Sequence, residues 1–202
     1  MQRLHVGGAA LMLAIAACAD PVSNARASDD AQLDEAASAV LSDQGNNGAS
    51  GGRTILVLDD CDPNDPAWAP TGGCALKRGQ VTEAEFGLLL GSALSASVVG
   101  HPAWRNEPSY LRIDAGQEVR VRNEGGRFHT FTNVALFGGG RIPPLNQGLT
   151  LAPECALAPG AVDPNGLVPG GRFDVNGLAV GDHRFQCCIH PWMRALVKVQ
   201  AN

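Results

Sequence analysis

The sequence predicts an all-β protein, a sandwich or barrel of antiparallel strands, on two observations. The 202 residues are 45% hydrophobic, but only 17% are charged and 5% aromatic, and they include 25 Gly and 13 Pro. This composition favours short strands joined by many turns over a bundle of helices. The second observation is that apolar residues alternate with polar ones in short runs after residue 110, which gives each strand one face for a core.

The expected strands are short β-rich runs bounded by turn residues. The first, over residues 54–58, is closed by a cluster of Asp and Pro residues. A Gly- and Pro-rich interval over 137–171 divides the later strands into two groups. These strands are expected over 111–113, 118–122, 128–132, 172–175, 183–187 and 195–199.

Residues 1–17 have the features of an export signal, a basic residue followed by a short apolar run. The run ends in Ile-Ala-Ala-Cys18, which resembles the lipobox of bacterial lipoproteins, in which the cysteine is acylated. Ordinary cleavage after Ala19 or Ala27 is the alternative, and it would release a soluble protein. Both alternatives place the protein outside the cytoplasm, and we expect a periplasmic or cell-surface protein tethered to a membrane through Cys18.

Composition divides the remaining chain into three parts. Residues 18–52 are small, polar and rich in acidic side chains, which is typical of a disordered tether. Residues 53–108 are expected to form an N-terminal extension packed on the domain, with one short helix over Val81–Leu94 that Thr82 can cap. Residues 109–202 are expected to form the main domain. The sequence leaves open whether the extension adds strands to the sandwich or forms a separate lid.

The charge and hydropathy of the chain exclude two classes of function. The formal net charge is −5 at pH 7, so there is no basic field to hold nucleic acid. After the export signal, no apolar run reaches the ~20 residues that a membrane span needs. We therefore expect contact with a membrane only through a lipid anchor.

Three side chains that bind soft metals lie within seven residues near the C-terminus: Cys187, His190 and Met193. One more imidazole would complete two His, one Cys and a long axial Met, the ligand set of a blue-copper electron-transfer site. His129 is the favoured candidate, because it lies in an expected strand after a Gly-rich turn. His183 is too far away, since it precedes Cys187 by four residues on the same expected strand.

The pattern Phe185-x-Cys187-x-x-His190-Pro191-x-Met193, followed by a short strand, resembles the ligand loop of the cupredoxins, the plastocyanin-like type 1 copper proteins. The spacing is most similar to the Cys-x2-His-x2-Met loop of the amicyanin type. Residues 118–130 resemble the strand and turn that carry the family's first histidine. The resemblance covers about residues 110–202.

This resemblance implies a Greek-key β-sandwich that binds one type 1 copper ion. The ligands that it implies are His129, Cys187, His190 and Met193. The interval between the first two looks longer than in small cupredoxins, which implies an inserted loop. We also expect Asn133, just after the His129 strand, to form a hydrogen bond near the sulfur or a ligand.

If Cys18 is acylated and Cys187 binds copper, four cysteines remain, and an even number suits disulfides in an oxidising compartment. Four cysteines allow three pairings. We expect Cys61–Cys74, which bracket a Pro- and Gly-rich segment, and Cys155–Cys188, because Cys155 lies in the inserted loop.

Adjacent cysteines in an extended chain point in opposite directions, so Cys187 can face copper while Cys188 faces the insert. The alternative is that Cys188 is the ligand. That choice leaves one residue before His190, which is too short for the family pattern.

Four protein ligands leave no open position for a substrate, so we expect a monomeric carrier of single electrons and not an enzyme. Multicopper enzymes of the same fold need further His-rich sites, and the chain has no His-x-His motif. The resemblance implies redox protein partners that dock at a surface-reaching His190, where Pro191 and Trp192 would form an apolar patch. The alternative is a copper-binding protein for delivery or tolerance.

Overall fold

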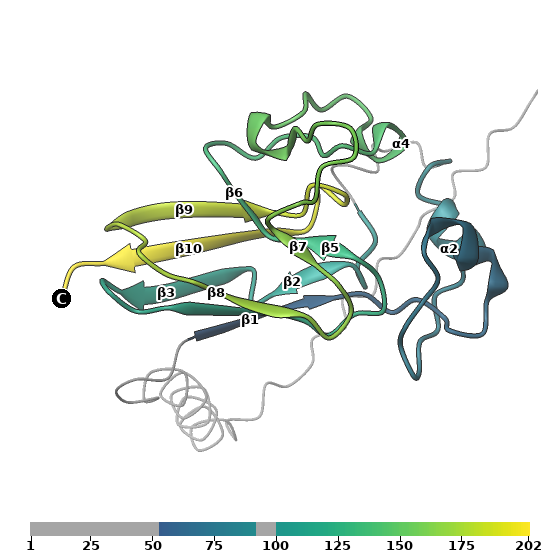
Figure 1. The fold of residues 1–202 in the computed structure, drawn as a ribbon, viewed down its shortest axis with the longest axis horizontal. Coiled ribbons are helices and arrows are strands. Elements are labelled where there is room, and N and C mark those ends of the chain that lie inside the picture. The colour runs from purple at the N-terminus through teal and green to yellow at the C-terminus, as the bar shows by residue number, and fades with distance from the viewer. Residues whose placement is uncertain (1–52, 92–99) are drawn as a thin grey trace, which may run out of the picture. The chain divides into compact units, whose positions relative to one another are not determined.

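The computed structural model describes residues 53–91 and 100–202. The expected export signal, the tether and the lipidation candidate Cys18 lie outside the described residues. The described chain forms two four-stranded sheets that face each other, together with a short two-stranded sheet (Figure 1). The predicted all-β sandwich is therefore confirmed. No helix in the described ranges is long and apolar enough to cross a membrane.

The first sheet has the strand order β2-β1-β4-β8. Strands β1 and β4 are parallel, with Ile55 opposite Val121, whereas the two outer pairs are antiparallel. Because β1 lies between β2 and β4, the segment before residue 109 contributes strands to the sandwich itself. The four strands are β1 (Arg53–Leu58), β2 (Arg105–Glu107), β4 (Val119–Asn123) and β8 (Arg172–Val175).

The second sheet has the order β3-β10-β9-β6, and β3 and β10 are parallel. The expectation of purely antiparallel strands is thus wrong for two pairs. Apolar residues alternate in the same way in parallel and in antiparallel strands, so alternation does not reveal the orientation of a strand. Consecutive strands β3 and β4 lie in different sheets, and such connections between the sheets determine which strands pair. The strands are β3 (Tyr110–Asp114), β6 (Thr132–Val134), β9 (Gly181–Gln186) and β10 (Arg194–Gln200).

The strand expected over 128–132 is broken into two at Phe131. Strand β5 (His129–Thr130) pairs with β7 (Gly166–Leu167) in the short sheet, while β6 continues into the second sheet. The backbone N–H of Phe131 donates to the carbonyl of Asn165, which lies outside both strands. The break separates His129 from the large sheets and places it at their end.

The core fills the space between the two large sheets. Apolar side chains of β1 and β4 meet those of β3, β9 and β10, and the rings of Phe131 and Phe185 stack with their centroids 4.5 Å apart. Burying these side chains supplies the main favourable free energy of folding. The buried strand residues include Ile55, Val57, Leu111, Ile113, Val119, Val121, Val197 and Val199.

Residues 61–91 and 100–104, between β1 and β2, form what we call the cover segment. It contains the short helices η1 (Pro66–Thr71) and α2 (Glu83–Gly87). Thr82 caps α2 as expected, since its side chain accepts a hydrogen bond from the backbone N–H of Glu85 at 3.1 Å. The helix is shorter than predicted because Gly87, a weak helix former, ends it, and the last part of the predicted range lies outside the described residues.

Residues 135–165, between β6 and β7, form the expected insert. It contains α4 (Pro143–Asn146) and the 3-10 turn η2 (Pro153–Cys155). Figure 1 shows the insert in green close to the loop between β9 and β10. The backbone N–H of Arg141 donates to the carbonyl of Cys188 at 2.6 Å, so the two segments are in direct contact.

Candidate metal centre

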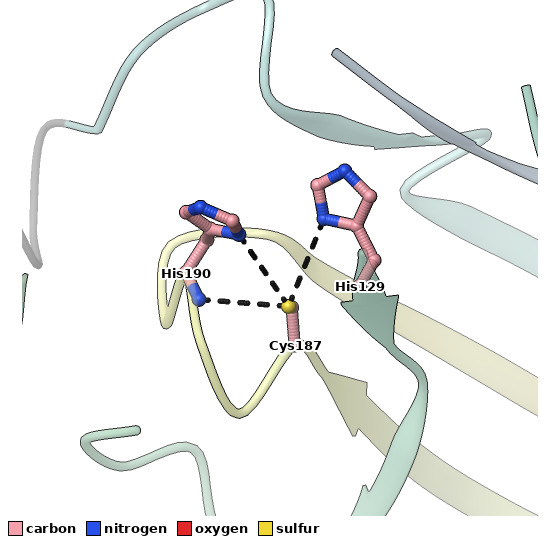
Figure 2. Close-up of side chains that lie close together, drawn as sticks. All are labelled: His129, Cys187 and His190. Atoms are coloured by element: carbon pink, nitrogen blue, oxygen red, sulfur yellow. Dashed lines mark hydrogen bonds between the residues drawn. The ribbon is translucent and has the colours of Figure 1, made fainter. Parts of the chain in front are cut away.

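Two histidines and one cysteine meet at one end of the sandwich (Figure 2). Cys187 and His190 belong to the ligand loop, residues 187–193, which joins β9 to β10, and His129 begins β5. Their ligand atoms all lie within 4.8 Å of one another, and all three side chains are buried. The topology thus brings together residues that are 58 positions apart in the sequence.

The three ligand atoms are spaced to hold one metal ion. Nδ1 of His129 lies 3.9 Å from Sγ of Cys187, and Nδ1 of His190 lies 3.7 Å from it. Metal–sulfur and metal–nitrogen bonds of about 2.3 and 2.0 Å, at a trigonal angle, place the two atoms about 3.7 Å apart. A trigonal set of two imidazoles and one thiolate is the donor set of blue copper. The residues present therefore fit copper.

Backbone groups fix the sulfur and the loop around it. The N–H groups of Thr130 and His190 point at Sγ of Cys187 from 3.4 and 3.5 Å. The N–H of Cys187 donates to the carbonyl of Met193, and the N–H of Met193 donates to the carbonyl of His190. These hydrogen bonds within the protein fix the sulfur and the loop.

Met193 lies at the end of the ligand loop, and its side chain is fully buried. This position agrees with a thioether that faces the centre rather than solvent. Its role as the axial ligand stays a prediction of the spacing between Cys187 and Met193.

The electrostatics of the group favour a thiolate. Burial alone would raise the pKa of Cys187, but hydrogen bonds and positive charge from His129 and His190 lower it well below its ordinary value. Burial opposes protonation of His129, yet its contacts with Asp59 and Cys187 raise its pKa to about 9. Burial lowers the pKa of His190 overall, despite the nearby sulfur. The thiolate is the form that binds a metal.

Asp59, directly after β1, is a residue of the site that the sequence pattern did not indicate. Its carboxylate accepts a hydrogen bond from Nε2 of His129 at 2.7 Å, and neither side chain is exposed. It also accepts from the backbone N–H groups of Cys61, Gly126 and Arg127. Burial alone would raise the pKa of Asp59, but His129 and these donors lower it overall. The contact spans 70 positions, so no local signal reveals it.

Both expected disulfides, Cys61–Cys74 and Cys155–Cys188, are present in the structure. Cys187 is the one cysteine without a disulfide among residues 53–91 and 100–202. Cys188 points to the insert and Cys187 to the histidines, so the alternative in which Cys188 is the ligand is wrong.

Among residues 53–91 and 100–202, the apolar docking patch expected at an exposed His190 is not found. His190 is only 6% exposed, because the rings of Phe86 and Trp104 in the cover segment lie 6.0 and 6.4 Å from its ring, centroid to centroid. Pro191 is buried, and Trp192 is half-buried with its Nε1 donating to the carbonyl of Trp104 at 3.1 Å. The cover segment packs from far away in sequence, so the loop motif alone could not predict it.

Two further side chains lie away from the centre. Asn133 is exposed, so it does not supply the expected hydrogen bond near the sulfur, and the backbone of Thr130 does so instead. His183 contacts the carbonyl of Ala179 through Nε2, in agreement with its exclusion as a ligand.

The β-sandwich presents a cysteine and a histidine in the loop before its last strand, and a second histidine on a neighbouring short strand. This arrangement agrees with the resemblance to cupredoxins that the sequence motifs carry, and the group is a candidate metal centre.

No family model matches the chain, and no curated protein matches it. Among solved structures, a purple cupredoxin from Nitrosopumilus maritimus matches with a TM-score of 0.39 and 16% identity, over 73% of this chain and 99% of that one. An oxidised amicyanin variant matches with a TM-score of 0.36 and 12% identity, over 76% of this chain and 87% of that one.

Proposed function

We propose that this protein is an exported type 1 copper protein that carries single electrons between redox partners. The observation that carries the proposal is the buried group of one thiolate and two imidazoles, spaced for one metal ion. When bound there, copper supplies exchange of one electron between its two oxidation states.

The residues around the group suit a carrier better than a reactive centre. The cysteine, the two histidines and Met193 are all buried. With Met193 as the fourth ligand, the centre would have no open position at which a substrate could bind. Backbone hydrogen bonds hold Cys187 and the loop in one geometry. A fixed ligand geometry limits the rearrangement that accompanies electron exchange. These features favour electron transfer over catalysis.

Delivery of copper is the second candidate, and burial of the ligands argues against it. A delivery protein must release its metal to a partner, whereas His190 lies under Phe86 and Trp104. The carrier is therefore the function that the site supports best.

Export is supported by the two disulfides, since such bonds persist in oxidising compartments outside the cytoplasm. We propose a lipid on Cys18 as the tether to a membrane. Mass spectrometry of the membrane-extracted protein tests this, because an unmodified N-terminus that starts after Ala19 or Ala27 would exclude the lipid. As partners we propose other redox proteins.

A reductive titration of the copper-loaded full-length protein tests the function. We expect one electron per protein, full reversal on reoxidation, and retention of the metal in the presence of a competing chelator. A carrier role would be excluded if reduction released the copper to the chelator within each cycle. That result would favour delivery.

A further inference from the structure

Asp59 is the one carboxylate that directly contacts a histidine of the metal centre in the described chain, and its surroundings are built around that contact. Its oxygens accept from Nε2 of His129 at 2.7 Å and from the backbone N–H groups of Gly126 and Arg127, both at 3.0 Å. A Cβ atom at Gly125 would lie only 2.2 Å from Oδ2 of Asp59, so glycine is needed for the turn to close over the carboxylate. The turn after β4 thus encloses Asp59 and aims it at His129.

The contact determines which nitrogen of His129 can bind a metal. An ionised carboxylate can accept hydrogen bonds but cannot donate them, so Nε2 of His129 must carry the proton. When a metal displaces the proton from Nδ1, the neutral ring has its lone pair on that atom, which faces Cys187 at 3.9 Å. Partners of this kind orient metal-binding histidines and make them stronger donors. Asp59 therefore prepares His129 as a ligand.

The contact also adds a negative charge to the buried centre. Asp59 has no exposed side-chain surface and forms its one ion pair with the ring of His129. The nearby guanidinium of Arg127 donates to the carbonyls of Gly73 and Thr71 and lies over the face of Trp68, and its charge also interacts with that of Asp59. Asp59 and Cys187 place two negative charges beside the metal position, and these attract the two positive charges of Cu(II) more strongly than the single charge of Cu(I).

We propose that Asp59 is a positioning residue that holds His129 in its metal-binding tautomer and, through its charge, favours Cu(II) over Cu(I). This inference rests on the proposed function. A negative charge near a buried metal site stabilises the metal ion of higher charge more, so the oxidised state gains relative to the reduced one. Without the carboxylate charge, this preference for Cu(II) is weaker.

The test is the Asp59→Asn variant of the full-length protein, loaded with copper. We expect Cu(II) affinity to fall tenfold or more, within the range of about 10- to 100-fold seen when such partners are lost, while Cu(I) affinity changes less. A tenfold selective loss corresponds to a rise of about 59 mV in the reduction potential. Asp163→Asn is the matched control, because Asp163 is a buried carboxylate that pairs with Arg141 and touches no ligand.

A blue Asp59→Asn protein with the wild-type potential would overturn the inference. Failure of the proposed function shows differently, as a wild-type protein that gives no type 1 spectrum at all. If the variant does not fold, proton NMR of the Cu(I)-loaded wild type tests which nitrogen of His129 carries the proton. We expect a slowly exchanging Nε2–H on His129, and a proton on Nδ1 or rapid exchange at Nε2 would overturn the inference.

Discussion

His129 and His190 turn the same ring nitrogen to Cys187, but their other contacts differ. The first is fixed by a hydrogen bond to a buried carboxylate, whereas the second is enclosed by aromatic rings. A hydrogen bond that makes a histidine a stronger donor and an apolar shell that excludes water are both means by which a protein adjusts a metal site. At the scale of single residues, the properties of the centre therefore depend on side chains beyond the ligands.

The axial position gives a prediction at this scale. Met193→Leu conserves volume and burial, so we expect the fold and the blue thiolate band to persist. The reduction potential should rise, because the loss of a weak axial donor withdraws more stabilisation from Cu(II) than from Cu(I). Potentiometry of both proteins measures the change. An unchanged potential would mean that Met193 is not a ligand.

At the scale of elements, the ligand loop is held from two sides. The cover segment places Phe86 and Trp104 against His190. On the other side, the insert donates a backbone hydrogen bond to Cys188, and Gln186, just before the loop, accepts one from Gly138 at 2.9 Å. Both contacts restrict the loop and shield it from water.

Opening the cover should expose the centre. Phe86→Ala removes a ring whose centroid lies 6.0 Å from that of His190. We expect a strong chelator to extract copper several times faster from this variant than from the wild type, and absorbance at the blue band follows the loss. Tyr110→Ala, at an exposed ring on the edge strand β3, is the control and should leave the rate unchanged. Equal rates in all three proteins would show that the cover does not restrict access.

The close packing of the insert gives a second prediction at this scale. A Cβ atom at Gly140 would lie 2.3 Å from the carbonyl oxygen of Cys188, so Gly140→Ala must displace backbone next to the ligands. We expect a loss of about 1–3 kcal/mol in the free energy of unfolding, and an altered copper spectrum.

The matched control for this change is Gly87→Ala. A Cβ atom there meets nothing within 4 Å, and the residue ends α2 far from any crowded contact. Urea denaturation compares both variants with the wild type. Equal stability of the Gly140 and Gly87 variants would contradict the packing described for the insert.

At the scale of the whole molecule, one disulfide joins the insert to the ligand loop, and the other closes a loop within the cover segment. Cys155–Cys188 closes 33 residues and Cys61–Cys74 closes 13. The chain-entropy relation assigns about 4 and about 3 kcal/mol to loops of these lengths. Paired Cys→Ala variants of each bond, studied by urea denaturation, should lose stability in that order. A greater loss for the shorter loop would contradict an origin in loop closure.

Local sequence signals predicted the parts of this structure that depend on neighbouring residues. The period of two located most strands, and the spacing from Cys187 to His190 located the loop. The parallel pairing of β1 with β4 and the contact of Asp59 with His129 join distant segments, and no local pattern encodes them. The burial of His190 escaped prediction for the same reason, since it depends on the cover segment.

The most direct test of a type 1 copper centre is the optical and electron paramagnetic resonance spectrum of the full-length protein after one equivalent of Cu(II). We predict an intense blue thiolate-to-copper band with narrow hyperfine splitting. Cys187→Ser should abolish both features, while His183→Ala, a histidine outside the site, should retain them. A colourless wild type with an ordinary square-planar copper signal would contradict the account, because the sulfur would then not be a ligand.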